Sequence, residues 1–140
     1  AVLTLNNCQL GFDFEKNGTV IDSVNSIVNV FETIVSINAL SYVSFISSVK
    51  SRISVQKSVV TASADVNVVI SANEGVVTSR DNSYTVAGQS GRVSELFSVK
   101  ASFINNKFKT VLSNETQVIN PIYKDENTEL TEQENQIIGL

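Results

Sequence analysis

The sequence lacks histidine, methionine and tryptophan, and it contains one cysteine and one proline. Without histidine, Ser–His–Asp and Cys–His catalytic arrangements are excluded, and a single cysteine leaves too few ligands for zinc. Cys8 has no partner for an intrachain disulfide. Asp13 and Glu15 are two residues apart, but beside a turn signal they are more typical of a solvated strand end than of a glycosidase pair. We therefore predict no enzyme, no metal and no cofactor.

Basic charge and long apolar runs are also scarce. The formal net charge is −4, so no global basic field attracts nucleic acid, and we expect no sequence-specific nucleic-acid partner. No apolar run approaches the roughly 20 residues of a membrane span, and the N-terminus does not resemble a signal peptide. We expect no membrane association. Ala1 is compatible with removal of an initiator methionine and with signal cleavage, which leaves the compartment open.

The acidic residues are concentrated near the C-terminus. Residues 125–134 contain five acids and no base, whereas residues 1–124 contain nine acids and ten bases. An apolar tip follows, formed by Ile137, Ile138 and Leu140. We predict a single β-rich domain over residues 1–124 and an acidic, extended C-terminal arm over residues 125–140. Such an arm can dock on a neighbouring copy as an exchanged element.

Valine and isoleucine are abundant, which favours strands. Between residues 60 and 72 the apolar side chains occupy the even positions, which is the period of a strand with one buried face. A turn signal at Asn73–Gly75 then leads into residues 76–86, and together these segments predict an antiparallel hairpin. We recognise no repeat of 20 to 50 residues.

One segment has a different period. From residue 20 to residue 49 apolar side chains recur at spacings of three and four, and Thr19 with Asp22 approximates a capping box. This pattern predicts a long amphipathic helix. The expected fold class is therefore α+β, an antiparallel β-sandwich or barrel-like sheet packed by one long helix near the N-terminus.

A helix of this length exceeds what one small domain covers, so we expect part of its surface to contact other copies of the chain. The chain is interpreted as a self-assembling, non-enzymatic structural subunit of a virion, of the phage tail tube or shell type. The alternatives are an extracellular filament or adhesin subunit, and a β-cup that carries an apolar ligand. No motif identifies a family. The candidate subunit contacts are Phe31, Val35, Tyr42, Phe45, Ile137, Ile138 and Leu140.

Overall fold

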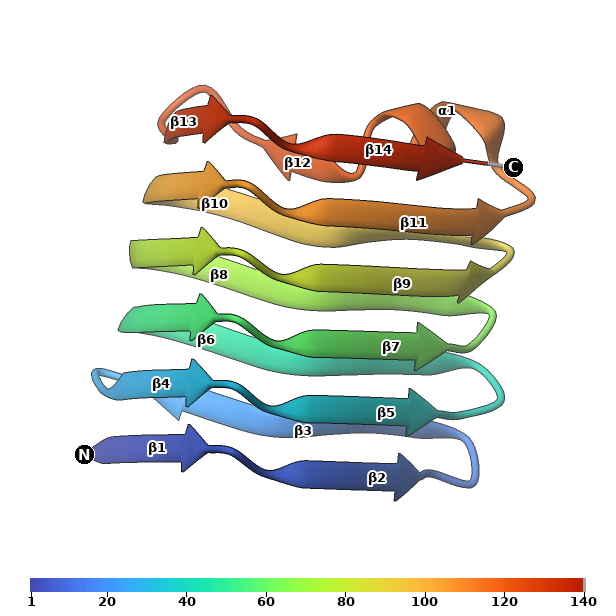
Figure 1. Ribbon diagram of the computed structural model, residues 1–140, viewed down its shortest axis with the longest axis horizontal. Coiled ribbons are helices and arrows are strands. Elements are labelled where there is room, and N and C mark those ends of the chain that lie inside the picture. The colour runs from blue at the N-terminus through green and yellow to red at the C-terminus, as the bar shows by residue number, and fades with distance from the viewer. Residues whose placement is uncertain (140) are drawn as a thin grey trace.

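The computed structural model describes residues 1–139 and shows a β-solenoid of about five turns. Successive coils lie one above another, from the N-terminus at one end to α1 and β12–β14 at the other (Figure 1). The elements are β1 (Val2–Asn6), β2 (Gln9–Asp13), β3 (Asn17–Val24), β4 (Ile27–Phe31), β5 (Ile34–Asn38), β6 (Tyr42–Gln56), β7 (Val59–Ser63), β8 (Val66–Arg80), β9 (Ser83–Gly88), β10 (Ser90–Ile104), β11 (Lys107–Leu112), α1 (Glu115–Ile119), β12 (Ile122–Lys124), β13 (Glu129–Gln133) and β14 (Gln136–Gly139).

All strand pairs are parallel, because each strand pairs with the same segment of the next coil. One sheet has the order β1-β4-β6-β8-β10-β12, with β3 paired to β6 and β13 paired to β10. The second sheet has the order β14-β11-β9-β7-β5-β2. Strands β6, β8 and β10 bend in the middle, so that the first half completes one coil and the second half begins the next.

The pairing reveals a repeat in the chain. Ile27 pairs with Val2 in the coil before it and with Arg52 in the coil after it, and Arg52 pairs with Val76. The repeat is therefore 24 or 25 residues long, and our expectation that no such repeat exists is wrong. The last step is longer because the segment that contains α1 is inserted there.

A corner between the two sheets recurs in every coil. A residue with positive φ occupies the turn, and a small polar residue follows it and hydrogen-bonds to the coil before it. The backbone N–H of Ser58 donates to Asn82 Oδ1 (2.9 Å), that of Asn82 to Asn106 Oδ1 (3.1 Å), and that of Asn106 to Asn135 Oδ1 (2.9 Å). These side chains satisfy amides that would otherwise be buried without a partner. The positive-φ residues of this corner are Asn7, Glu32, Lys57, Asp81, Asn105 and Glu134.

The core consists of inward-facing side chains stacked in lanes along the solenoid. In the second sheet, Val35, Val60, Tyr84 and Phe108 occupy one lane and are all buried. The hydroxyl of Tyr84 lies 2.6 Å from Ser79 Oγ. Burial raises the pKa of Tyr84 above its ordinary value of 10.0, although hydrogen bonds from Ser79 and Asn82 oppose the shift.

The structure overturns the predicted fold class. It is neither an antiparallel sandwich nor a barrel, and the predicted helix over residues 20–49 does not exist, because these residues form strands of two successive coils. At each corner the turn residue, such as Glu32, shifts the phase of the strand alternation. As a result, the apolar residues of this segment are spaced as on one face of a helix, although they lie on both sides of the strands. Val28 and Val35 are buried, whereas Ile34 is exposed.

The predicted antiparallel hairpin between residues 60–72 and 76–86 is also wrong. These residues belong to β7, β8 and β9, and the Asn73–Gly75 segment is a bend within β8. Val60 and Ile70 do face the core. The error arises because a solenoid exposes one face of each parallel sheet to solvent, so its strands alternate as antiparallel strands usually do.

Candidate functional site

The two ends of the solenoid leave strand edges without a neighbour among residues 1–139. At the N-terminal end the outer strands are β1, β2 and β3, and at the C-terminal end they are β12, β13 and β14 (Figure 1). Unpaired strand edges are templates for further strand pairing unless charges, proline or a covering element block them.

The backbone groups at the edge of β1 follow from its bonds to β4. Ile27 N donates to Ala1 O (2.9 Å), and Asn7 N donates to Phe31 O (2.9 Å), so the odd-numbered peptide groups of this strand face β4. Alternation along a strand then places the other N–H and C=O groups on the open edge. These are the backbone groups of Val2, Thr4 and Asn6.

The inward side chains of the first coil are apolar and incompletely covered. Leu3 is 41% exposed, whereas Val28, its neighbour in the same lane one coil further, is 1% exposed. A pocket of about 160 Å³ lined by Leu3, Ile21 and Val28 opens into the core at this end. The partly exposed apolar side chains of the first coil form what we call the N-terminal end layer: Leu3, Leu5, Leu10, Phe12 and Phe14.

The apolar surface continues around the neighbouring corner of the solenoid. Val2 and Val24 are 66% and 59% exposed, and Ile27 and Val49 are also exposed. β1 itself contains no charged residue. β1 contains neither the lysine nor the proline that often protects an outer strand, whereas the other outer strands of this end carry Asp13 on β2 and Asp22 on β3.

The C-terminal end has a different composition. Glu132 on β13 pairs in register with Phe103, so the carboxylate occupies an inward lane in which Phe103 is completely buried. A pocket of about 360 Å³ at this end is lined by Phe108 and Ile137 together with Glu132. An inward-pointing charge on an outer strand opposes further strand pairing.

α1 and its flanking turns cover one side of this end (Figure 1). Thr110 Oγ1 donates to Val118 O (2.8 Å), and the backbone N–H of Gly91 donates to Gln117 Oε1 (2.9 Å). α1 therefore packs against β10 and β11. The C-terminal end is partly closed, in contrast to the N-terminal end.

The acidic segment is joined to the solenoid at its start. The Asp125 carboxylate accepts hydrogen bonds from the backbone N–H of Ser98 (3.0 Å) and from Thr128 Oγ1 (2.8 Å), and these bonds lower the pKa of Asp125. Residues 129–133 and 136–139, which we expected in an extended arm, form β13 and β14 and pair with β10 and β11 of the same chain.

The candidate contacts drawn from the predicted helix lie in different environments. Val35 and Phe45 are buried in the core at 1% and 0% exposure, where no second copy can reach them. Phe31 and Tyr42 are half-buried, and the Lys57 ammonium lies over the Phe31 ring at 5.5 Å from its centre. The structure brings none of these four residues into the N-terminal end layer.

The C-terminal candidates lie on β14. Ile137 and Ile138 are 51% and 45% exposed, and Leu140 lies outside the described residues. The sequence did not point to the N-terminal end layer. Its leucines and phenylalanines look like ordinary core residues, and only the coil register shows that they occupy the outermost layer of the core.

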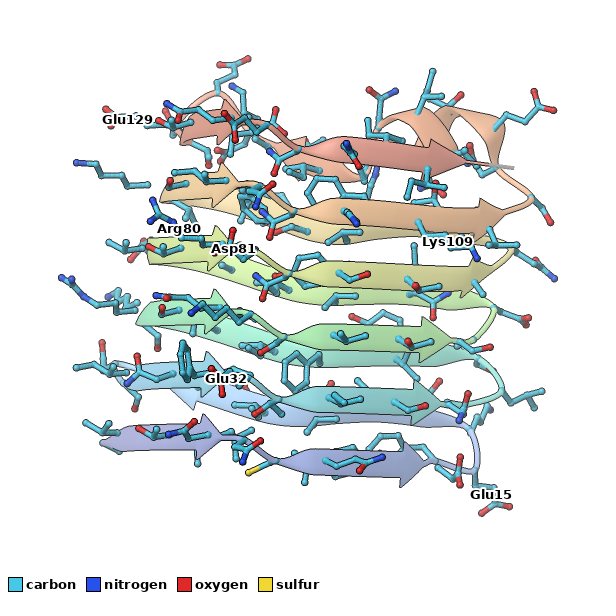
Figure 2. All side chains as sticks on the ribbon, viewed as in Figure 1. Glu15, Glu32, Arg80, Asp81, Lys109 and Glu129 are labelled. Carbon is cyan, nitrogen blue, oxygen red and sulfur yellow. The ribbon has the colours of Figure 1, made fainter. Side chains whose placement is uncertain are left out.

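The lateral face of the second sheet is uniform and uncharged in its middle coils. β5, β7 and β9 contain no charged residue. Ser36, Thr61 and Thr85 stand in register on the outward side of these strands and form a column of hydroxyl groups. Charged side chains such as Glu15 and Glu129 project away from the coils elsewhere (Figure 2).

Within residues 1–139 no three cysteine, aspartate or glutamate side chains are grouped to hold a metal ion. No helix in the same part of the chain is long and apolar enough to cross a membrane. Asp13 accepts a hydrogen bond from Asn38 Nδ2 (3.1 Å) at an exposed position. No protein-family model, curated protein or solved structure matches the chain.

Proposed function

We propose that this chain is a non-enzymatic structural subunit that assembles with copies of itself. The observation that carries the proposal is the fold, in which successive coils pair in register and build one continuous buried core. Apolar side chains on the outside of the coils supply surface for contacts between copies, among them Ile34 and Val59, which are 50% and 42% exposed and lie in register on the second sheet. Burial of such apolar surface favours association.

The solenoid suits a structural role because consecutive coils are joined by backbone hydrogen bonds along the whole axis. Each repeat contacts its neighbours and extends the same core. We place such a subunit in a virion, with an extracellular filament as the alternative. The phage tail tube type was inferred from a β-sandwich with a long helix. Because the fold is a β-solenoid, this part of the interpretation no longer has support.

The adhesin alternative is favoured by one observation, the uncharged column of Ser36, Thr61 and Thr85. Neutral hydroxyl groups at regular spacing suit an uncharged, hydroxyl-rich surface such as a polysaccharide. Binding to an insoluble neutral polysaccharide that is lost in Thr61→Lys would favour this function. No such observation favours the carrier alternative, since the small residues Ala62 and Ala72, which could leave room for an apolar ligand, are packed in the core at 0% and 2% exposure.

Sedimentation velocity of the unmodified chain tests the proposed function. From about 1 to 100 µM, a range that covers ordinary subunit affinities, we expect the mass to rise from 15.2 kDa to a multiple of it. A chain that stays at 15.2 kDa throughout this range would contradict self-assembly.

A further inference from the structure

We infer that two copies of the chain bind each other face to face through the second sheet, with the order of their coils reversed. The contact surface is the outward side of β5, β7 and β9, which we call the second-sheet face (Figure 1). The inference rests on the proposed function, and it names the surface and the partner. Three features of this face support it: an apolar pair, facing hydroxyl groups, and charges of alternating sign along one border.

The apolar pair lies next to the corner at which each coil enters the second sheet. Ile34 on β5 and Val59 on β7 are register neighbours on the outward side, at 50% and 42% exposure. Two sheets can pack face to face at about 10 Å with their strands nearly aligned. A second copy in this position would cover the pair and remove its apolar surface from water.

A two-fold axis parallel to the strands, placed between β5 and β7, makes the second-sheet face complementary to itself. The axis keeps the strand direction and reverses the order of the coils, so that β5 of one copy faces β7 of the other. Ile34 of each copy then meets Val59 of the other, and this contact occurs twice. Ser36 meets Thr61 in the same way, so that hydroxyl groups face hydroxyl groups, which both donate and accept hydrogen bonds.

The charges along the corner select this position of the axis. Successive positive-φ corner residues are Glu32, Lys57 and Asp81, so the sign alternates from coil to coil. An axis between β5 and β7 brings Glu32 of each copy opposite Lys57 of the other. An axis centred on β7 would instead place Lys57 opposite Lys57 and Glu32 opposite Asp81, and like charges at a contact oppose association. Lys57 is exposed, and its flexible stem lets the ammonium turn from the Phe31 ring toward the second copy.

The charges on the strands favour reversed coils over parallel ones. Within residues 1–139, the charged residues on the strands of the second sheet are Asp13 on β2 and Lys107 and Lys109 on β11. Parallel coils would place Lys109 opposite Lys109, whereas reversed coils direct it toward the Asp13 side of the other copy. At the opposite border Leu40 and Asp65 occupy equivalent turns, and the axis places them against each other, so that no two acids meet.

A charge exchange at exposed positions tests the contact. Glu32→Lys should weaken association about tenfold at low salt, whereas Glu32→Lys combined with Lys57→Glu should restore it. Glu74→Lys is the matched control, because Glu74 is also a positive-φ residue beside a lysine, Lys50 at 3.9 Å, but lies at the bend within the first sheet. Sedimentation velocity at about 0.01 M and about 1 M salt measures all three variants, and the effect of Glu32→Lys should shrink at high salt. Circular dichroism confirms that each variant retains its strand content.

A second pair of variants tests the apolar contact without a change of charge. Val59→Thr keeps the shape of the side chain and replaces one methyl group with a hydroxyl. Because the substitution occurs twice in a two-fold contact, we expect association to weaken about tenfold. Val49→Thr is the control, since Val49 on β6 of the first sheet has a similar exposure of 41% and should leave association unchanged. Equal effects of the two substitutions would overturn the inference.

The possible results separate this inference from the proposed function. A chain that is monomeric at all concentrations overturns both of them. An assembly that Glu32→Lys and Glu74→Lys affect equally, or that the double exchange does not restore, overturns the face-to-face contact and leaves self-assembly standing. An open series of species that grows with concentration does the same, because a two-fold contact closes at two chains. If Thr61→Lys abolishes binding to a neutral polysaccharide and leaves the assembly intact, the second-sheet face belongs to the polysaccharide and the inference is overturned.

Discussion

The asparagines at the corner of the solenoid connect adjacent coils twice. Asn106 Oδ1 accepts from the N–H of Asn82 (3.1 Å), and Asn106 Nδ2 donates to Ser79 O (3.1 Å) in the same earlier coil. Thr33 at the equivalent position lacks a second arm, and its hydroxyl donates to Phe31 O within its own coil. Asparagine is therefore the side chain that best holds two coils together at this corner.

Replacement of Asn106 tests this role. Asn106→Ala leaves a buried N–H and a buried carbonyl without their side-chain partners, and we expect a loss of about 2 to 4 kcal/mol in the free energy of unfolding. Asn73→Ala is the control, since Asn73 is exposed on β8 and should change stability by less than about 0.5 kcal/mol. Urea unfolding measures both, and equal losses in the two variants would refute the role of the corner.

Tyr84 predicts a dependence of stability on alkaline pH. Burial raises its pKa in the folded chain, so the unfolded chain releases this proton first, near its ordinary value of 10.0. Stability therefore falls as the pH rises above about 10, by up to about 1.4 kcal/mol per pH unit from this group. Tyr84→Phe should be less stable than the unmodified chain at pH 7, and the difference should narrow above pH 10.

Unfolding curves of the unmodified chain and Tyr84→Phe at pH 7 to 11 measure that difference. Tyr42, whose pKa is also raised by partial burial, titrates equally in both proteins and cancels in the comparison. A difference that stays constant across this range would show that Tyr84 does not carry the alkaline loss.

At the scale of the element, strands could be predicted from the sequence and corners could not. The alternation between residues 60 and 72 predicts strands correctly, but it joins β7 and the start of β8, which lie in different sheets, and Val66 on its predicted buried side is 38% exposed. The corners are occupied by residues such as Glu32 and Lys57, which adopt positive φ although glycine and asparagine are the usual turn signals there. Because the corners are unmarked, parts of four strands, β3 to β6, resemble one helix.

The positive φ of Glu32 predicts a stabilising substitution. Glu32→Gly removes the steric cost of a left-handed conformation, so we expect a gain of up to about 1 kcal/mol in the free energy of unfolding. Glu95→Gly removes the same charge from the interior of β10, and it should destabilise by about 0.5 to 1 kcal/mol. Thermal unfolding distinguishes the two, and a loss of stability in Glu32→Gly would contradict the role of the corner.

At the scale of the whole molecule, the stacking of coils depends on contacts between residues 24 or 25 positions apart. Residues at equivalent positions of successive coils share only a general character, such as the largely apolar side chains in the lane of Val35, Val60, Tyr84 and Phe108. The repeat is therefore weak in sequence, and the outermost layers are defined only once the register is known. The N-terminal end layer could not be predicted for that reason.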